Sequence, residues 1–361
     1  MRIAIDAREL KGKPTGVGRY LAEILAAWAQ LPAARAHDVI LLTPDVASGF
    51  PDVASGFSRK GNGGTLWEQL TLPGLVRKAR ADVLFAPGYT GPLRCPVPMV
   101  LTVHDVSFAA HPEWFRWREG LRRRTLTRLS AQRAARVLTV SEFSKREITR
   151  GLHILPDKIE VIYSGMSLLG SPARTQQDSR PVDDHLVLYV GSIFNRRHVP
   201  ELIEGFARLA RRRGDVRLEI VGDNRTTPQV PVESLVQATG VADRIRVRPY
   251  VPDDELASLY NRAGAFAFLS EYEGFGLTPL EALGAGIPIV VLDTLVAREI
   301  YGDAALYVDG PNPALIETAL ERALVDEASR ERVLTAARAL LPRYSWRDCA
   351  ARVLDVLVTA R

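Results

Sequence analysis

The chain has 361 residues, of which 47% are hydrophobic and 25% are charged, and this length indicates two domains of comparable size. The sequence contains no apolar run of about 18 residues or more, which excludes a membrane-spanning helix of the usual kind. Its two cysteines, Cys95 and Cys349, are too few for a disulfide framework or a zinc site.

The net charge of +5 is unevenly distributed along the chain. Residues 1–172 contain 24 lysines and arginines against 15 acidic residues, whereas the remainder contains 23 against 27. The first half therefore faces an anionic partner or carries a basic, solvated surface. The chain starts with "MRIAIDAREL", which indicates a buried strand in place of a signal segment, so we expect a cytoplasmic protein.

Short β-branched segments alternate with longer helical patterns along the chain and fall into two series. Near-continuous apolar strands separated by helices indicate parallel sheets that are covered on both faces. Two such series predict two doubly wound α/β domains. The predicted strands are 2–7, 38–43, 82–87, 99–105, 136–141 and 159–165 in the first series, and 186–191, 216–222, 245–250, 265–270, 287–292 and 305–309 in the second.

The segment 167–185, "SLLGSPARTQQDSRPVDDH", separates the two series and is typical of a linker, because it is polar and has no periodicity. We therefore expect an N-terminal domain over 1–170 and a C-terminal domain over 171–342. The last segment, 343–361, has the apolar spacing of an amphipathic helix, which we expect to pack back on the first domain.

Residues 44–57 are a perfect tandem duplication of "PDVASGF". A surface loop tolerates such a duplication, so the simplest prediction is a long loop. The alternative is a flap beside an acceptor site.

The segment "EYEGFGLTPLE", residues 271–281, has the features of a helix start. Thr278 followed by Pro279 is typical of an N-cap and a first helical turn, and Glu281 then completes a capping box. This structural role is one interpretation of Glu281, and a ligand-binding role is the other.

Three further residues of this segment are not needed for a helix cap. Gly274 and Gly276 let backbone N–H groups approach a ligand, and a helix N-terminus favours phosphate. Glu273 follows the predicted strand 265–270, at the edge where open parallel sheets bind ligands. A carboxylate there can accept hydrogen bonds from sugar hydroxyls, so the segment predicts a pocket for a phosphorylated sugar compound.

The two glutamates eight positions apart, with "GFG" between them and "GAGIPIV" after them, closely resemble the signature of the family-four retaining glycosyltransferases. The resemblance implies the GT-B fold, in which two Rossmann-like, doubly wound parallel-sheet domains face each other across a cleft. It also implies that Glu273 holds the hydroxyls of the donor sugar and that Glu281 holds the nucleotide ribose. The backbone that would line the sugar and the diphosphate is that of Gly274, Phe275, Gly276 and Leu277.

Two further segments of the second half extend the resemblance. "LYVGSIFNRRHVPELIEGF", residues 188–206, resembles the family's strand–loop–helix start, where a glycine and an Arg/Lys pair meet the donor diphosphate. The family usually has lysine where this chain has Arg197, and a planar guanidinium is not equivalent to a compact ammonium. The residues in these positions are Gly191, Arg196 and Arg197. The base of the nucleotide would lie near Tyr250 and Val251.

The first half of the chain contains the remaining candidates. His104 ends a predicted strand, where a lone histidine is often structural, but the resemblance implies that it contacts the donor sugar. Asp105 follows it in the cleft. We expect Ser141 and Ser144 to cap the next helix. The resemblance also places the loop of residues 11–25 beside the diphosphate or the acceptor, through Gly16, Gly18 and Arg19.

Residues 113–136 are unusually rich in arginine. Eight arginines lie between 116 and 136 with one acidic residue, Glu119, and aromatic residues precede them. One interpretation is a solvated helix face. The other is an interfacial helix that contacts anionic lipid headgroups, with the protein on the inner face of the plasma membrane. Nucleic acid is not an expected partner, because no recognition module is evident.

The sequence has no Asp-x-Asp motif and no His/Cys cluster, so we expect neither a metal nor a cofactor. Cations and backbone dipoles would then stabilise the leaving nucleoside diphosphate. The resemblance implies transfer with retention of configuration, with His104 positioning the sugar. We expect transfer of a hexose from a nucleoside-diphosphate sugar to a glycan or lipid-linked glycan in cell-surface polysaccharide synthesis. A mannose-type donor, GDP-mannose, is favoured over UDP-hexoses.

Two alternatives stay open at this point. A nucleotide-sugar 2-epimerase of the same fold would need acid and base groups that the sequence does not supply in an evident cluster. A non-enzymatic sugar-binding protein would not need the pair Arg196 and Arg197. A dehydrogenase is disfavoured, because no Gly-x-Gly-x-x-Gly follows a strand with an acidic residue about 20 positions on.

Overall fold

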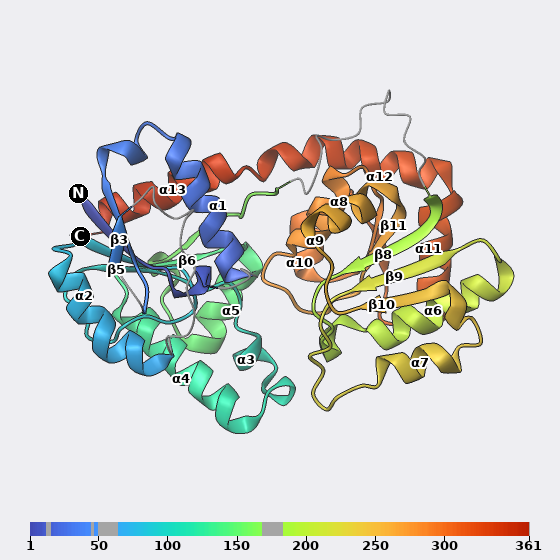
Figure 1. Cartoon of the computed structure of the whole chain (residues 1–361), viewed down its shortest axis with the longest axis horizontal. Coiled ribbons are helices and arrows are strands. Elements are labelled where there is room, and N and C mark those ends of the chain that lie inside the picture. Colours follow the sequence, from blue (N-terminus) through green and yellow to red (C-terminus); the bar gives the residue numbers. More distant parts are fainter. Residues whose placement is uncertain (12–15, 45–46, 50–63, 168–182, 361) are drawn as a thin grey trace. The chain divides into compact units, whose positions relative to one another are not determined.

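The computed structural model divides the chain into two compact units, and it describes residues 1–11, 16–44, 47–49, 64–167 and 183–360 (Figure 1). The first unit comprises Met1–Gly165 together with Tyr344–Arg361, and the second comprises Met166–Arg343. The boundary predicted at 170/171 lies outside the described residues. The predicted linker extended to residue 185, but strand β8 already begins at Asp183.

The first unit contains a seven-stranded sheet in the order β3-β2-β1-β4-β5-β6-β7. All neighbouring strands are parallel except β2 and β3, which pair antiparallel. The order reverses direction between β1 and β4, which makes this the topological switch point of the sheet. The strands are β1 (Arg2–Asp6), β2 (Asp38–Leu42), β3 (Ala47–Gly49), β4 (Val83–Ala86), β5 (Met99–Thr102), β6 (Arg136–Thr139) and β7 (Ile159–Val161).

Strand β3 was not predicted, because residues 47–49 fall in the duplicated segment that we expected to be a loop. Its sequence, Ala-Ser-Gly, has low β propensity, so the pairing with β2 and not the local sequence makes it a strand. The duplicated residues 45–46 and 50–57 lie outside the described part of the chain.

Alternate residues of the strands β1, β2, β4, β5 and β6 contribute to two separate cores. Ile3 and Ile5 pack on one face with helices α1 and α13, whereas Ala4 packs on the other face with α2, α4 and α5. The C-terminal helix α13 thus belongs to the core of the first unit, and Trp28 Nε1 of α1 donates to Ala350 O of α13 over 2.7 Å. The helices are α1 (Val17–Gln30), α2 (Leu72–Lys78), α3 (Ser107–Ala110), α4 (Trp117–Arg133), α5 (Glu142–Leu152) and α13 (Trp346–Thr359).

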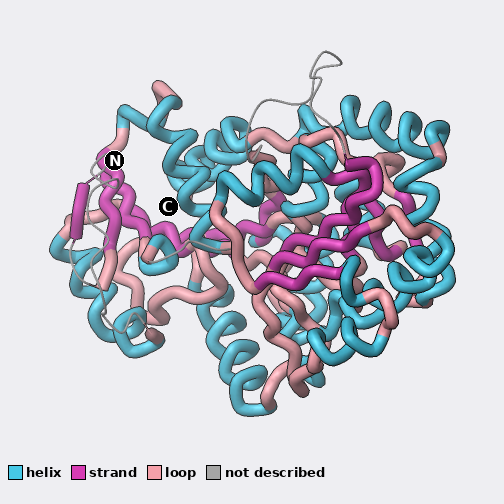
Figure 2. Tube along the Cα trace, turned by 45° about the vertical axis from the view of Figure 1, so that its right-hand side comes forward, coloured by secondary structure: helices cyan, strands magenta, loops and turns pink. Residues whose placement is uncertain are grey.

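The second unit contains a six-stranded, fully parallel sheet in the order β10-β9-β8-β11-β12-β13, with helices on both faces (Figure 2). Its switch point lies between β8 and β11. The strands are β8 (Asp183–Val190), β9 (Arg217–Val221), β10 (Ile245–Arg248), β11 (Ala263–Phe268), β12 (Ile289–Leu292) and β13 (Leu306–Val308). The helices are α6 (Val199–Arg212), α7 (Val232–Ala238), α8 (Asp253–Arg262), α9 (Leu277–Gly284), α10 (Leu295–Tyr301), α11 (Pro313–Val325) and α12 (Glu327–Leu340).

These two sheets confirm the predicted fold class of two Rossmann-like, doubly wound α/β domains. All twelve predicted strands are present, with ends that differ by a few residues. Most were predictable because the central strands are buried on both faces and therefore form apolar runs in the sequence. Within the described residues, none of the helices has the length and apolarity needed to cross a bilayer.

A buried charge network joins the end of β1 to a π-helical turn, Trp67–Thr71. Arg8 Nη2 lies 2.9 Å from Asp6 Oδ2 and also contacts Glu68 Oε2, and Thr90 Oγ1 donates to the same Glu68 oxygen over 2.7 Å. Asp6 and Glu68 are almost fully buried. Burial raises the pKa of Asp6 to about 6, although the Arg8 charge opposes this shift.

This network predicts a pH dependence of stability. Between about pH 4 and about pH 6, Asp6 holds a proton in the folded protein but has released it in the unfolded chain. The free energy of unfolding therefore falls as the pH rises through this range. The effect is on the order of 3 kcal/mol over the window. In urea unfolding at about pH 4.0 to 6.5, the free energy of unfolding should decline less steeply with pH for Asp6→Asn than for the wild type. Equal slopes would contradict the assignment.

Candidate functional site

The loop after β8 makes a close backbone approach in which only glycine fits. Gly191 has φ +144°, and a Cβ there would lie 2.8 Å from Arg197 Nη1. A Cβ on Gly222, at the end of the neighbouring strand β9, would lie 1.9 Å from Gly191 O. The carboxyl ends of β8 and β9 are therefore held together by backbone contact, and the loop leads directly to the turn Asn195–Arg197.

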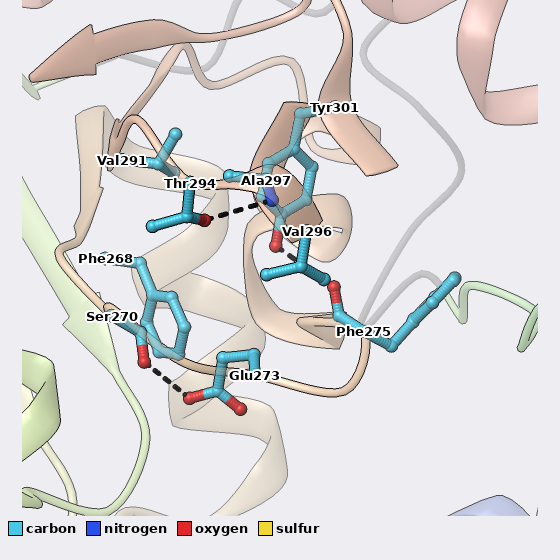
Figure 3. Close-up of a pocket in the computed structure, with 9 residues that line it drawn as sticks. All are labelled: Phe268, Ser270, Glu273, Phe275, Val291, Thr294, Val296, Ala297 and Tyr301. Atoms are coloured by element: carbon cyan, nitrogen blue, oxygen red, sulfur yellow. Dashed lines mark hydrogen bonds between the residues drawn. The ribbon is translucent and has the colours of Figure 1, made fainter. Parts of the chain in front are cut away.

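Arg197 and Glu273 form an ion pair across the switch point. Arg197 Nε donates to Glu273 Oε1 over 2.8 Å. Ser270 Oγ donates to the same oxygen over 2.9 Å, as Figure 3 shows. Arg197 Nη1 also donates to Ser192 O over 2.9 Å. Arg197 comes from the loop after β8 and Glu273 from the loop after β11, so the adjacency of these two strands brings them together. No hydrogen bond from the described residues falls on Glu273 Oε2.

The pair is largely withdrawn from solvent, with side-chain exposures of 13% for Arg197 and 17% for Glu273. Burial by itself would raise the pKa of Glu273, but the charges of Arg197 and Arg196 outweigh it and hold the pKa below its usual value. Burial opposes the charge on Arg197 as well, yet Glu273 raises the pKa of the guanidinium. Glu273 is therefore a carboxylate at neutral pH, and its Oε2 can accept a hydrogen bond.

Helix α9 begins differently from the prediction. Its first residue is Leu277, and its N-cap is Gly276 with φ +89° and no side-chain cap. The predicted capping box of Thr278 and Glu281 is thus wrong. Proline fits any position of the first helical turn, because the N–H groups there have no partner within the helix. Pro279 therefore does not determine which residue is the first of α9.

Glu281 is buried and accepts a hydrogen bond from Tyr260 Oη over 3.2 Å. Gly276 is fixed by Tyr301, whose hydroxyl donates to Gly276 O over 3.0 Å. A Cβ on Gly276 would lie 2.1 Å from that hydroxyl oxygen, so both the backbone angle and the contact require glycine.

Glu273 borders a small hollow between the ends of β11 and β12 and helix α10 (Figure 3). Thr294 Oγ1 in its wall caps α10 by accepting from Ala297 N over 3.2 Å. Ser270, Thr294 and Tyr301 were not predicted from the sequence. Ser270 directly precedes the glutamate signature, which was the one available signal. The lining residues are Phe268, Ser270, Glu273, Phe275, Val291, Thr294, Val296, Ala297 and Tyr301.

The other predicted donor-side residues also lie in the second unit. Arg196 Nε donates to Tyr272 O over 3.2 Å, and its guanidinium carbon lies 4.4 Å from the centroid of the Phe194 ring. Tyr250 is 53% exposed, whereas the neighbouring Val251 is buried. Gly274 and Phe275 are buried. The structure therefore gathers Gly191, Arg196, Arg197 and Glu273, and leaves Tyr250 as an exposed ring after β10.

In the first unit, His104 is a neutral, oriented side chain. Its Nε2 lies 2.8 Å from Pro87 O, and since a carbonyl only accepts, Nε2 carries the hydrogen and Nδ1 is an acceptor. Burial lowers the pKa of His104, which favours this neutral form. The ring of Tyr20 meets the imidazole edge-on at 4.8 Å between centroids. Asp105 accepts from Tyr89 Oη over 2.7 Å and from Ser107 N over 2.9 Å.

Helix α1 begins beside this histidine. Gly16 is its N-cap with φ +53°, Gly18 is buried and Arg19 is half-buried, and residues 12–15 of the loop lie outside the described part. Ser141 caps α5 by accepting from Ser144 N over 3.0 Å, as predicted. Ser144 does not cap the helix but donates to His104 O over 3.0 Å, which anchors the backbone of the histidine.

Two family models match the chain and together span most of it. "Glycosyltransferase Family 4" matches residues 14–168, and "Glycosyl transferases group 1" matches residues 172–340. The chain is a family-four glycosyltransferase. The two models meet where the chain passes from the first unit to the second, so each covers one of the two sheets of this glycosyltransferase.

Curated relatives agree with this membership, and solved structures share the fold. The O-antigen chain mannosyltransferase B of Escherichia coli is 29% identical over 71% of this chain and 69% of its own length. The D-inositol 3-phosphate glycosyltransferase of Xylanimonas cellulosilytica is 32% identical over 56% of this chain and 52% of its own length. Several matches thus span only about half to two thirds of the relatives. HepE of Anabaena, solved in complex with UDP-glucose, has a TM-score of 0.73 with 18% identity, covering 99% of this chain and 100% of that one.

Among the described residues of this glycosyltransferase, no group of three or more His, Cys, Asp or Glu side chains is arranged to hold a metal ion.

Proposed function

We propose that this glycosyltransferase transfers a hexose, with retention of configuration, from a nucleoside-diphosphate sugar to a glycan or lipid-linked glycan in cell-surface polysaccharide synthesis. The observation that carries the proposal is the position of Glu273. Its free Oε2 lies at the carboxyl edge of β11, beside two arginines and the left-handed start of α9. Hydroxyl acceptors, phosphate-binding cations and a helix N-terminus meet there, as a nucleotide-sugar requires.

Each residue of this site has a role in the proposal. Glu273 Oε2 accepts from a hydroxyl of the donor sugar, while Oε1 stays on Arg197. Arg196 and Arg197 neutralise the diphosphate, with backbone N–H groups from Gly274 to Leu277. Glu281 binds the ribose, Tyr250 and Val251 lie against the base, and Gly191 allows the diphosphate to approach. His104 positions the sugar. The acceptor-side residues are Gly16, Gly18, Arg19 and Asp105.

The reaction breaks the bond between the anomeric carbon and the diphosphate oxygen, and the bonding electrons leave with the diphosphate. The acceptor hydroxyl oxygen bonds to the same face of the anomeric carbon, and its proton passes to the departing phosphate. No metal or cofactor takes part in this scheme, because the two arginines and the start of α9 carry the charge.

A mannose-type donor is the favoured donor in this proposal. The name of the Escherichia coli relative, a mannosyltransferase, supports mannose, and the UDP-glucose complex of the structural relative supports a nucleotide-sugar in the same fold. The polysaccharide setting is supported by the O-antigen name of the first relative.

Incubation with GDP-mannose, GDP-fucose, UDP-glucose and UDP-N-acetylglucosamine, with and without EDTA, tests the proposal. We expect slow release of one nucleoside diphosphate, fastest from GDP-mannose and unaffected by EDTA. Proton NMR of the sugar as it is released to water, before it mutarotates, should show the anomeric configuration of the donor. Release of an epimerised sugar would favour a 2-epimerase instead, and binding without turnover would favour a sugar-binding protein.

A further inference from the structure

Four large apolar side chains are exposed on two segments of the first unit. Leu66 and Leu70 are 77% and 75% exposed, and Trp117 and Leu121 of helix α4 are 71% and 57% exposed. Single exposed apolar residues are common on protein surfaces, but four on two adjoining segments are not explained by the fold. We call these residues, with the exposed arginines of α4, the basic apolar face.

The first segment, residues 66–70, is anchored by buried side chains, and its two leucines are exposed to solvent. The π-helical turn Trp67–Thr71 buries Trp67 and Glu68 against the core. Glu68 is fixed by Arg8 and Thr90, as described above. Because the buried positions are occupied by Trp67 and Glu68, Leu66 and Leu70 point away from the core.

The second segment, helix α4, has an exposed face that mixes arginines with apolar residues. Its buried side consists of small residues: Gly120, Thr127, Ser130 and Ala131. Its exposed side carries Trp117, Leu121 and Leu129 between arginines. All eight arginines from 116 to 136 are exposed, and the acidic residue Glu119 pairs with one of them, Arg123, over 2.7 Å.

The two segments lie side by side. Arg122 Nη1 of α4 donates to Thr65 Oγ1, next to Leu66, over 3.0 Å. In Figure 1, α4 and the segment that leads into α2 run past each other along one side of the first unit. The leucines of one segment and the tryptophan, leucine and arginines of the other therefore belong to one surface.

We propose that this basic apolar face docks the enzyme on an anionic lipid bilayer. The excess of arginine selects a negatively charged partner, and Trp117 with the three leucines can enter the boundary between headgroups and acyl chains. Long arginine side chains can lie along the apolar boundary while their guanidinium groups reach the phosphates. An acidic protein would pair with the arginines but would not need four separate apolar side chains. The inference does not depend on the donor or on the sugar-transfer site.

Cosedimentation of the full chain with vesicles tests this face. We expect binding to vesicles of phosphatidylcholine with about 30% phosphatidylglycerol, and at least tenfold weaker binding to phosphatidylcholine alone. Arg118→Gln/Arg122→Gln should weaken binding to the anionic vesicles roughly 10- to 30-fold, since each arginine near such a surface contributes about fivefold. Leu66→Ala/Leu70→Ala and Trp117→Ala/Leu121→Ala should each weaken it about tenfold.

Matched controls separate docking from general charge and folding effects. Leu155 is 75% exposed elsewhere in the first unit, and Arg332 and Arg338 are exposed on α12. Leu155→Ala and Arg332→Gln/Arg338→Gln should bind vesicles as the wild type does. All variants should keep wild-type release of nucleoside diphosphate in solution, which shows that they are folded. Equal binding to both kinds of vesicle, equal loss in the controls, or tighter binding to duplex DNA than to anionic vesicles would overturn the proposal.

Discussion

Replacing Glu273 with glutamine is expected to lower kcat/KM for nucleotide-sugar turnover by about two orders of magnitude. Glutamine keeps the shape of the side chain and can still accept from Ser270 Oγ, which bonds to Oε1 in the native protein. It lacks the negative charge that Arg197 pairs with, and its amide nitrogen cannot accept a sugar hydroxyl. The variant should therefore bind the free nucleoside diphosphate while losing contact with the sugar.

Glu271→Gln is the matched control for this substitution. Glu271 lies two residues away, and its exposed side chain contacts His198 at 3.5 Å. Its loss should change turnover by less than about threefold, in the range of an exposed ion pair. The account would be contradicted if Glu273→Gln and Glu271→Gln had the same activity. A loss in Glu273→Gln that disappeared on cooling would also contradict it, because that would indicate instability and not a missing contact.

Arg197→Met is expected to have the largest combined effect on stability and activity. It leaves the carboxylate of Glu273 buried without its partner, which costs about 3 to 5 kcal/mol. It also removes a cation from the proposed diphosphate site, which lowers turnover by about two to three orders of magnitude. Urea unfolding and steady-state turnover measure the two effects separately.

Two further variants separate these effects. Arg197→Lys keeps the charge but has one nitrogen in place of the Nε and Nη1 that bond to Glu273 Oε1 and Ser192 O. It should therefore recover part of the stability and part of the turnover that Arg197→Met loses. Arg197→Met/Glu273→Gln removes the unpaired charge, so it should recover stability relative to Arg197→Met but no activity. If the double variant lost as much unfolding free energy as the two single variants together, the unpaired charge would not be the cause of the instability of Arg197→Met.

The strands and the glutamate signature could be predicted from the sequence because both are local patterns. Buried parallel strands are apolar throughout, and the signature is contained in eleven residues. The link between Arg197 and Glu273 could not be predicted, because 76 residues separate them and only the adjacency of β8 and β11 brings them together. The expectation that Arg197 would serve the diphosphate did not include a carboxylate partner.

The errors have similar physical causes. The capping box failed because the left-handed backbone of Gly276, held by Tyr301, starts α9 two residues earlier than an N-cap at Thr278 would. β3 was missed because tertiary pairing overrides a weak local propensity. The exposure of Leu66 and Leu70 could not be predicted from the sequence either. Apolar residues at 66, 67 and 70 have the spacing of a buried helix face, and the π-helical turn Trp67–Thr71 leaves the two leucines exposed.

The central claim is that the second unit binds a nucleotide-sugar through Glu273, and a thermal-shift panel tests it most directly. Nucleoside diphosphates and their sugars are added to the wild type and to Glu273→Gln at about 100 times the dissociation constant. A ligand that binds the folded state stabilises it there by about 2.7 kcal/mol. We predict that one nucleoside diphosphate raises the Tm of both proteins and that its sugar adds a further rise in the wild type alone. A panel in which no nucleotide raises the Tm of the wild type would contradict the account.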